Sequence, residues 1–377
     1  MKKFLSIMLS LVMVMALFTG CGDKKAEDNS SFFKEAAKMQ NVKTGTADLE
    51  FAINMKGSGV TNDTEIPDLL KNGDDLALKL KFEVTAESET KNAVKVLAQY
   101  GANDYAEITT IVADGTKLYV NVGSISDFIK SIDESVGAQF DAVLGQVGAS
   151  QYVSIDLKQV CETSGVKIPD MSESADSMQK LSKKMLETLD KSFADIQGKD
   201  GDDYTLTVGS GNADKVADAI VKFCEDGSVK EMYTELMNFY VDLFGADTEI
   251  GKQFAELKDN TSEMDEAIKE VKDNKDGIVK ALKDSKINAV AKCSVTGDEG
   301  EREGKLSFDS GEFKDTEDDV TAQITLTSNI KEGSASIKDL VPTEGVVDLT
   351  AMVNAAMSQL GALGTDGTDG LSGEGIY

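Results

Sequence analysis

Histidine and tryptophan are absent from this chain of 377 residues, and arginine occurs once, at Arg302. Without histidine, Ser-His-Asp and Cys-His catalysis is excluded, and so are zinc sites with imidazole ligands. Acidic residues that could act in pairs on a glycoside are plentiful, but there is no tryptophan on which a sugar could stack. We therefore predict that the protein is not an enzyme and has no catalytic residue, no cofactor and no metal.

Positive charge is scarce as well. The chain has 39 Lys and Arg residues against 67 Asp and Glu residues, which gives a net charge of -28. A surface this acidic repels phosphate backbones and anionic lipid headgroups, so nucleic acid is excluded as a partner. We expect the charge to serve solubility.

Only four cysteines are present, and they have no close spacing. Cys161, Cys224 and Cys293 form an odd set once Cys21 is set aside for the reason given below. One disulfide plus one thiol is possible in an exported protein, and the pairing is left open. We favour three buried thiols that act as small apolar side chains.

Short motifs in the chain are better explained by chance or by turns. Ser164–Lys167 and Ser177–Lys180 match S-x-x-K, and Lys43–Gly45 matches K-T-G, but K-T-G should follow the other motif in a penicillin-binding serine enzyme. Asp200–Asp203 and Asp366–Asp369 lack the ligand spacing of a calcium loop, so we interpret them as solvated turns.

The first residues have the three-part layout of a secretory signal. Met1-Lys2-Lys3 is cationic, Phe4–Phe18 is apolar and uncharged, and Thr19-Gly20-Cys21 closes the segment with small residues. The apolar run is shorter than the roughly 20 residues of a membrane-spanning helix, although a retained helical anchor is the alternative.

The run Leu17-Phe18-Thr19-Gly20-Cys21 resembles the lipobox of bacterial lipoproteins. This resemblance implies cleavage before Cys21 and lipid attachment to its sulfur, with acyl chains such as palmitate holding the protein to the membrane. We accordingly expect a signal peptide at 1–20, a flexible tether at 21–31, a single α+β domain at 32–363, and a disordered Gly/Asp-rich tail at 364–377.

Two long stretches alternate between apolar and polar residues. Ala47–Met55 has its apolar residues at odd positions, and Leu76–Ala86 has them at even positions. A period of two over this length predicts strands with one wet face, and such strands belong to an antiparallel sheet. Asp114-Gly115 predicts a hairpin turn between two further strands. The other strands are predicted at 93–100, 105–112, 117–122, 151–157, 204–208, 287–295, 305–308 and 320–330, with a short edge at 334–337.

Helical periodicity fills the intervening segments. Apolar residues recur at intervals of three and four from Ile125 to Val147, which predicts one helix with a possible kink at Gly137. Ser228 and Glu231 fit a capping box at the start of a later helix. Other helices are expected around 31–39, 178–196, 212–224, 254–282 and 348–360.

The predicted elements come in the order strands, helices, strands. This order favours one large curved antiparallel sheet, a half-open barrel with amphipathic helices on its apolar face. Over Thr44–Ile337 this layout resembles the LolA/LppX-like lipoproteins, and the resemblance implies a half-open barrel that cradles helices and often a lipid. No binding residue carries over from the family, so the ligand-binding residues are unknown.

We therefore expect an extracytoplasmic lipoprotein of the cell membrane, tethered through Cys21, that binds or carries a lipid or another apolar ligand. One alternative is a cell-surface structural or interaction module without a small ligand. A second alternative is a transporter-associated solute-binding protein, whose fold requires parallel strands alternating with helices. The sequence identifies neither a protein partner nor an oligomeric state.

Overall fold

A computed structural model describes residues 31–355, apart from gaps at 40–41, 43, 59, 61–70, 73–74, 89, 102, 150, 165–170, 226, 260–261 and 316–319. The predicted signal peptide, the predicted lipid attachment at Cys21 and the predicted tail at 364–377 all lie outside the described residues.

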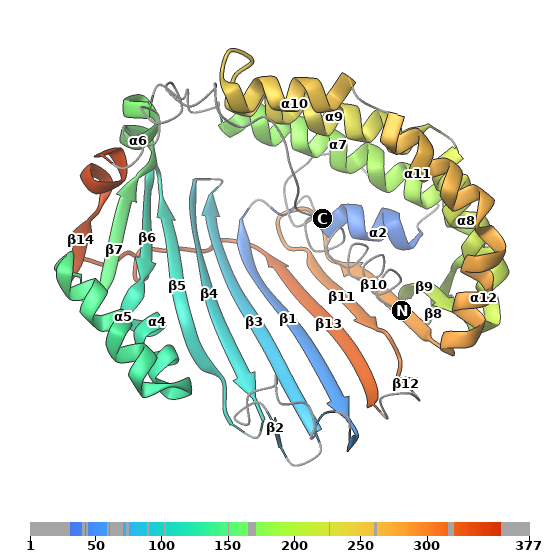
Figure 1. Ribbon diagram of the computed structural model, residues 1–377, viewed down its shortest axis with the longest axis horizontal. Coiled ribbons are helices and arrows are strands. Elements are labelled where there is room, and N and C mark those ends of the chain that lie inside the picture. The colour runs from blue at the N-terminus through green and yellow to red at the C-terminus, as the bar shows by residue number, and fades with distance from the viewer. Residues whose placement is uncertain are drawn as a thin grey trace, which may run out of the picture.

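One open, curved sheet of 14 strands organises the chain (Figure 1). Its main path runs β14-β7-β6-β5-β4-β3-β1-β13-β11-β10-β9-β8, with β2 beside β3 and β12 beside β13. Every pairing is antiparallel except that of β14 with β7, so the predicted fold class is confirmed. The strands are β1 (Gly45–Lys56), β2 (Lys71–Asn72), β3 (Asp75–Ser88), β4 (Lys91–Tyr100), β5 (Ala106–Asp114), β6 (Lys117–Asn121), β7 (Tyr152–Asp156), β8 (Gln197–Asp200), β9 (Asp203–Gly209), β10 (Asn288–Thr296), β11 (Glu303–Asp309), β12 (Phe313–Asp315), β13 (Val320–Glu332) and β14 (Val346–Asp348).

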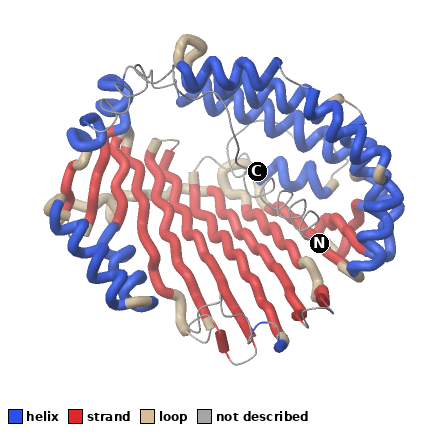
Figure 2. The backbone as a smooth tube through the Cα atoms, in the orientation of Figure 1, coloured by secondary structure: helices blue, strands red, loops and turns tan. Residues whose placement is uncertain are grey.

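The helices gather at the two ends of the sheet and along one side of it (Figure 2). α4 and α5 lie over the β5–β7 end, α2 lies over the β9–β10 end, and α7 to α12 form an arch (Figure 1). The helices are α2 (Phe32–Met39), α4 (Val122–Ile132), α5 (Glu134–Gln146), α6 (Leu157–Ser164), α7 (Met171–Ser192), α8 (Ala213–Glu225), α9 (Ser228–Phe244), α10 (Glu249–Asp259), α11 (Ser262–Asp273) and α12 (Lys275–Ser285), with 3₁₀ turns η2 (Ala194–Ile196) and η3 (Ser210–Asn212).

Strands from the two halves of the chain meet along β1. This strand pairs with β3 on one side and with β13 on the other, so that Phe51 lies between Leu80 and Leu326. The predicted hairpin is formed by β5 and β6, where Gly115 supplies a φ of 66° at the turn.

The prediction of one helix from Ile125 to Val147 is wrong, because the chain breaks at Asp133. The Asp133 carboxylate accepts hydrogen bonds from the backbone N–H groups of Ser135 and Val136, and so it caps α5 as a new helix. Gly137 does not kink a helix. A Cβ at Gly137 would lie 2.9 Å from the Cα of Lys130, so this glycine lets α5 approach α4 closely.

The capping box predicted at Ser228 is also wrong. α9 begins at Ser228 as expected, but Gly227 occupies the N-cap position with a φ of 79°.

The C-terminal part of the domain also differs from the prediction. Residues 334–337 form no strand; with their neighbours they cross the convex face of the sheet behind the strands (Figure 1). Ile337 is 2% exposed and packs with Ala93 and Val112 in a small cluster. We call residues 333–345 the strap. After it the chain adds β14 to the far edge of the sheet, and residues 350–355, the described part of the helix expected around 348–360, are helical.

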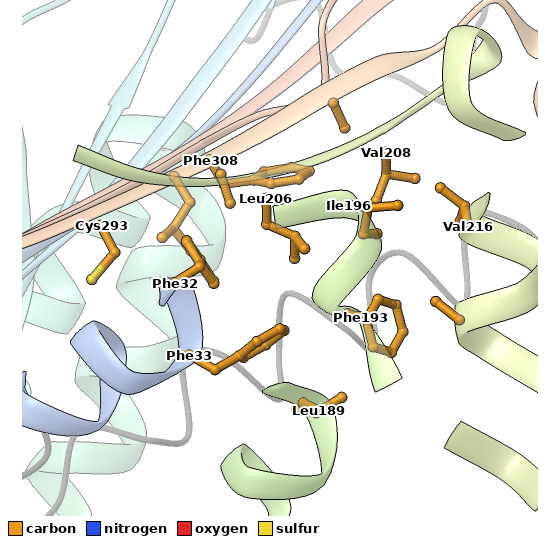
Figure 3. Close-up of a cluster of buried hydrophobic side chains, with 14 of the residues drawn as sticks. Phe32, Phe33, Leu189, Phe193, Ile196, Leu206, Val208, Val216, Cys293 and Phe308 are labelled. Atoms are coloured by element: carbon orange, nitrogen blue, oxygen red, sulfur yellow. The ribbon is translucent and has the colours of Figure 1, made fainter. Parts of the chain in front are cut away.

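The largest core cluster lies between helices α2, α7, α8 and α12 and strands β9, β10, β11 and β13 of the sheet (Figure 3). Phe32 and Phe33 of α2 are 1% and 4% exposed, and the Phe33 ring contacts Phe193 with ring centroids 6.2 Å apart. At the start of α2 the Phe32 N–H donates to Gln197, which ties this helix to the edge strand β8. α2 therefore occupies one end of the concave face.

Candidate ligand-binding face

Apolar side chains run across the concave face in continuous rows. One row is Leu326, Phe51, Leu80 and Ala98, from β13 through β1 and β3 to β4. A parallel row begins at Ile330 and continues through Ala47, Val84, Val94, Ile111, Val120 and Val153. Because paired residues point to the same side of a sheet, each row forms one continuous apolar stripe across the sheet.

Both ends of these rows are covered by helices. At one end, Met39 of α2 lies over Gly304 and within 3.6 Å, Sγ to Sδ, of Cys293, and the cluster reaches Ala47 and Leu49 on β1. At the other end, the Phe128 ring of α4 packs edge-on against Tyr100, and Val120 and Val153 pack with the α4–α5 pair. The buried core therefore stops at β1 on one side and at the end of β4 that carries Tyr100 on the other.

The middle of the face belongs to none of the core clusters of the described residues. Its apolar side chains are half-buried, and no described helix lies in front of these strands in Figure 1. We call this surface the open apolar face. It consists of Phe51, Ile53, Leu78, Leu80, Phe82, Val84, Val94 and Val96.

The open apolar face is broad. Strand geometry gives it a length of roughly 20 Å from Leu78 to Val84 and a backbone width of roughly 10 Å from β1 to β4. The rows that compose it contain no charged residue between β13 and β5. A contiguous apolar surface of this kind marks a binding site for an apolar molecule, a membrane or a partner.

The opposite, convex face of the same strands is charged. The Lys81 ammonium lies 2.7 Å from Glu83 and 4.0 Å from Asp48, and its hydrogen bond to Glu83 raises its pKa. The Tyr105 hydroxyl donates to Glu50 at 2.7 Å, and burial together with this bond raises the pKa of Tyr105 above its usual range. Apart from the cluster under Ile337, the sheet is therefore apolar on its concave side and polar on its convex side, as the alternation predicted.

A polar hollow of about 660 Å³ lies between α4 and α5, away from the open apolar face. Asp141 accepts hydrogen bonds from the Lys130 ammonium at 2.5 Å and from Ser126, and the bond to Lys130 lowers the pKa of Asp141. These bonds from Lys130 and Ser126 of α4 to Asp141 of α5 hold the two helices together. The hollow is lined by Asn121, Gly123, Ser124, Ser126, Asp127, Lys130, Asp141, Leu144, Gly145, Ala149 and Gln151.

Cys293 behaves as a small apolar residue. It is 1% exposed and a free thiol, and burial raises its pKa to about 12, which keeps it protonated. Cys224 lies half-buried on α8, and Cys161 lies in α6. The structure thus supports our interpretation for Cys293.

The predicted turn at Asp200–Asp203 joins β8 to β9, and Asp200 pairs with Lys292 at 2.7 Å. Among the described residues, no group of three or more acidic or cysteine side chains is placed to hold a metal ion. Of the S-x-x-K and K-T-G motifs, Lys43 and Lys167 fall outside the described part of the chain.

No family model, curated protein or solved structure matches this chain. The likeness to the LolA/LppX-like lipoproteins therefore rests on the sequence layout alone. None of the described helices is both long enough and apolar enough to cross a membrane.

Sequence reasoning named no ligand-binding residue, and the open apolar face supplies the candidates. The alternation in Ala47–Met55 and Leu76–Ala86 was the signal that these residues share a face. The sequence could not show which part of that face the helices would leave uncovered, because helix placement depends on contacts between distant segments.

Proposed function

We propose that this protein is a non-enzymatic lipoprotein, tethered to the membrane through Cys21, that binds a lipid or another apolar molecule on the open apolar face. The observation that carries the proposal is the half-buried apolar centre of a sheet whose two ends are packed with helices. An apolar surface of this size that stays half-buried favours an occupant.

The physical chemistry of the face favours an acyl chain or a similarly featureless apolar group. The open apolar face has no polar group that would fix the orientation of a ligand. Binding would therefore rest on burial of the ligand's apolar surface, which contributes roughly 25 cal/mol per Å². The excess of acidic residues on the chain disfavours anionic headgroups held by charge.

Of the two alternatives, the solute-binding protein is disfavoured. Its fold needs a parallel sheet with helices on both faces, whereas the described sheet has one parallel pair, β14 with β7. The interaction module without a small ligand remains as an outcome of the tests.

Two neighbouring residues on β1 give a matched test. Ile53 lies on the open apolar face, and Asn54 lies on the convex face, so Ile53→Asp and Asn54→Asp add the same charge to opposite sides of one strand. We expect Ile53→Asp to weaken binding of a fluorescent fatty acid at least tenfold, because a carboxylate would be buried under the chain. Asn54→Asp should bind as the unmodified protein does.

A second variant, Ile53→Thr, keeps the test valid if Ile53→Asp fails to fold, since threonine has the β-branched shape that suits a strand. It should fold, as judged by circular dichroism, and bind less tightly. Equal binding by all three variants would contradict the proposed site.

A further inference from the structure

Helix α5 has the composition of a buried helix, but it lies at the surface. Charged residues make up 28% of the chain, yet Asp141 is the only one between Ser135 and Val147. A helix with so few charged side chains is normally packed inside a protein. In α5, however, only Gly137 and Leu144 are buried, and most of the other residues are exposed. This surface therefore suits a partner that presents apolar groups.

Exposed apolar side chains follow one side of α5. Val136 and Val143 are 48% and 58% exposed, and the half-buried Phe140 lies between them, because the spacings are four and three residues. Ile132, the last residue of α4, is 41% exposed. Three of the seven large apolar side chains that are exposed in the described part of the chain thus lie in the α4–α5 pair. We call Ile132, Val136, Phe140 and Val143 the apolar stripe.

The apolar stripe reaches the open apolar face through α4. Phe128 precedes Ile132 by one helical turn, so the two side chains lie on the same side of α4. The Phe128 ring packs edge-on against Tyr100, and Tyr100 of β4 pairs with Leu78 of β3, which belongs to the open apolar face. Apolar side chains therefore lead from the stripe over α4 to the border of that face.

A lipid bilayer suits the apolar stripe better than a protein does. A helix of this length offers a surface roughly 20 Å long and 10 Å wide. A stable protein contact needs about 800 Å² from each partner, which is several times more. Tyrosine, tryptophan and arginine carry much of the binding energy in protein interfaces, and residues 122–147 contain none of them. A second copy of this acidic chain would also be repelled by its charge.

The length of the predicted tether also favours the bilayer. Helix α2 starts at Phe32, so residues 21–31 span at most about 40 Å when fully extended. A lipid attached to Cys21 would keep the apolar stripe at a high effective concentration near the bilayer, where even a weak contact forms. Because the net charge is -28, headgroups without net negative charge are favoured.

We infer that the apolar stripe docks this protein on the lipid bilayer, and that an apolar ligand passes between the bilayer and the open apolar face over the docked α4–α5 pair. The stripe enters roughly 5–10 Å, to the boundary between headgroups and acyl chains. Passage of the ligand rests on the proposed function, whereas docking is tested without it.

A single tryptophan reports docking, because the chain has no tryptophan of its own. The chain also lacks histidine, so a hexahistidine tag before Gly22 is its one strong link to phosphatidylcholine vesicles that contain a nickel-chelating lipid. The tag replaces the tether whether or not Cys21 is lipidated, and the chain 22–377 keeps every described residue. Val143→Trp places the probe on the stripe. Leu257→Trp is the matched control, because Leu257 is 48% exposed on α10, far from α5 in Figure 1.

Phosphatidylcholine brominated along its acyl chains should quench the emission of Val143→Trp by roughly half and that of Leu257→Trp by less than about a tenth, because quenching requires contact with the acyl chains. Equal quenching at the two positions, or none at either, would overturn docking. An emission shift of Val143→Trp that grows with protein concentration in the absence of vesicles, without quenching in their presence, would identify a contact between copies and overturn docking as well.

Transfer of a pyrene-labelled fatty acid from the same vesicles to the tagged chain tests passage. The double variant Val136→Asp, Val143→Asp places two charges on the stripe, and the control Ala138→Asp, Ala142→Asp places them on another side of the same helix. All four side chains are exposed, so both variants should fold. We expect transfer to the stripe variant to be at least about fivefold slower than to the control, because charges resist entry into the bilayer.

The same fatty acid added from water separates passage from binding. Both variants should bind it equally, because neither substitution touches the open apolar face. Equal rates of transfer from vesicles to the two variants would overturn passage and leave the proposed function intact. If no chain binds the fatty acid from either source, the proposed function is contradicted and passage with it, whereas quenching at Val143→Trp would still establish docking.

Discussion

Met39 and Gly304 show how single residues decide where the concave face is filled. The Met39 side chain lies so close to β11 that a Cβ at Gly304 would come within 2.9 Å of the Met39 Cγ. The missing side chain thus lets α2 settle onto the sheet. On the open part of the face, the equivalent positions carry full-sized side chains such as Phe82 and Val84, and no described helix covers them.

Substituting Gly304 should therefore disturb α2. Gly304→Val is expected to lower the free energy of unfolding by about 1–3 kcal/mol, since overcrowding in a packed core outweighs the higher strand propensity of valine. Met39→Ala alone should cost about 2–5 kcal/mol by leaving a cavity. Urea unfolding of the double variant measures the coupling between them.

If Met39 is the group that valine displaces, the double variant loses less stability than the sum of the single losses, by at least about 0.5 kcal/mol. Strictly additive losses would show that the two side chains do not share the space described.

At the scale of elements, the strap fastens one half of the sheet to the other. It leaves β13, passes behind the strands, and delivers β14 to the edge beside β7. Ile337 packs with Ala93 and Val112 midway, where its backbone N–H also donates to Glu87 at 3.1 Å. Few other apolar contacts hold the strap, so Ile337 is its main attachment.

Ile337→Ala should lower the free energy of unfolding by about 2–5 kcal/mol, as truncation of a fully buried isoleucine does. Val143→Ala is the control, because Val143 is 58% exposed and its truncation should change stability by less than about 0.5 kcal/mol. Denaturant titration of both variants measures the difference. A loss for Ile337→Ala as small as the control would mean that the strap contributes little to stability.

The elements that could be predicted from the sequence are those with a long local pattern. Ala47–Met55 and Leu76–Ala86 alternate over many residues and became β1 and β3, and Gly115 marked its hairpin. β8 and β14 escaped prediction because a short edge strand has no buried face to impose alternation. The break at Asp133 escaped because the apolar stripe continues across it.

At the scale of the whole molecule, the concave face is one surface because β1 and β13, from opposite ends of the chain, pair along their length. No local signal encodes that pairing, although the order of strands, helices and strands made a single sheet the better prediction. The same reasoning could not locate the open apolar face, because its limits are set by α2 and α4.

Native mass spectrometry of the protein purified from its own host, combined with lipid extraction, tests the central claim most directly. The account predicts a non-covalent apolar molecule that accompanies the unmodified chain and Asn54→Asp, is lost from Ile53→Asp, and is released on unfolding, unlike a lipid attached to Cys21. If all three chains carry no mass beyond the polypeptide and its covalent lipid, the account is contradicted.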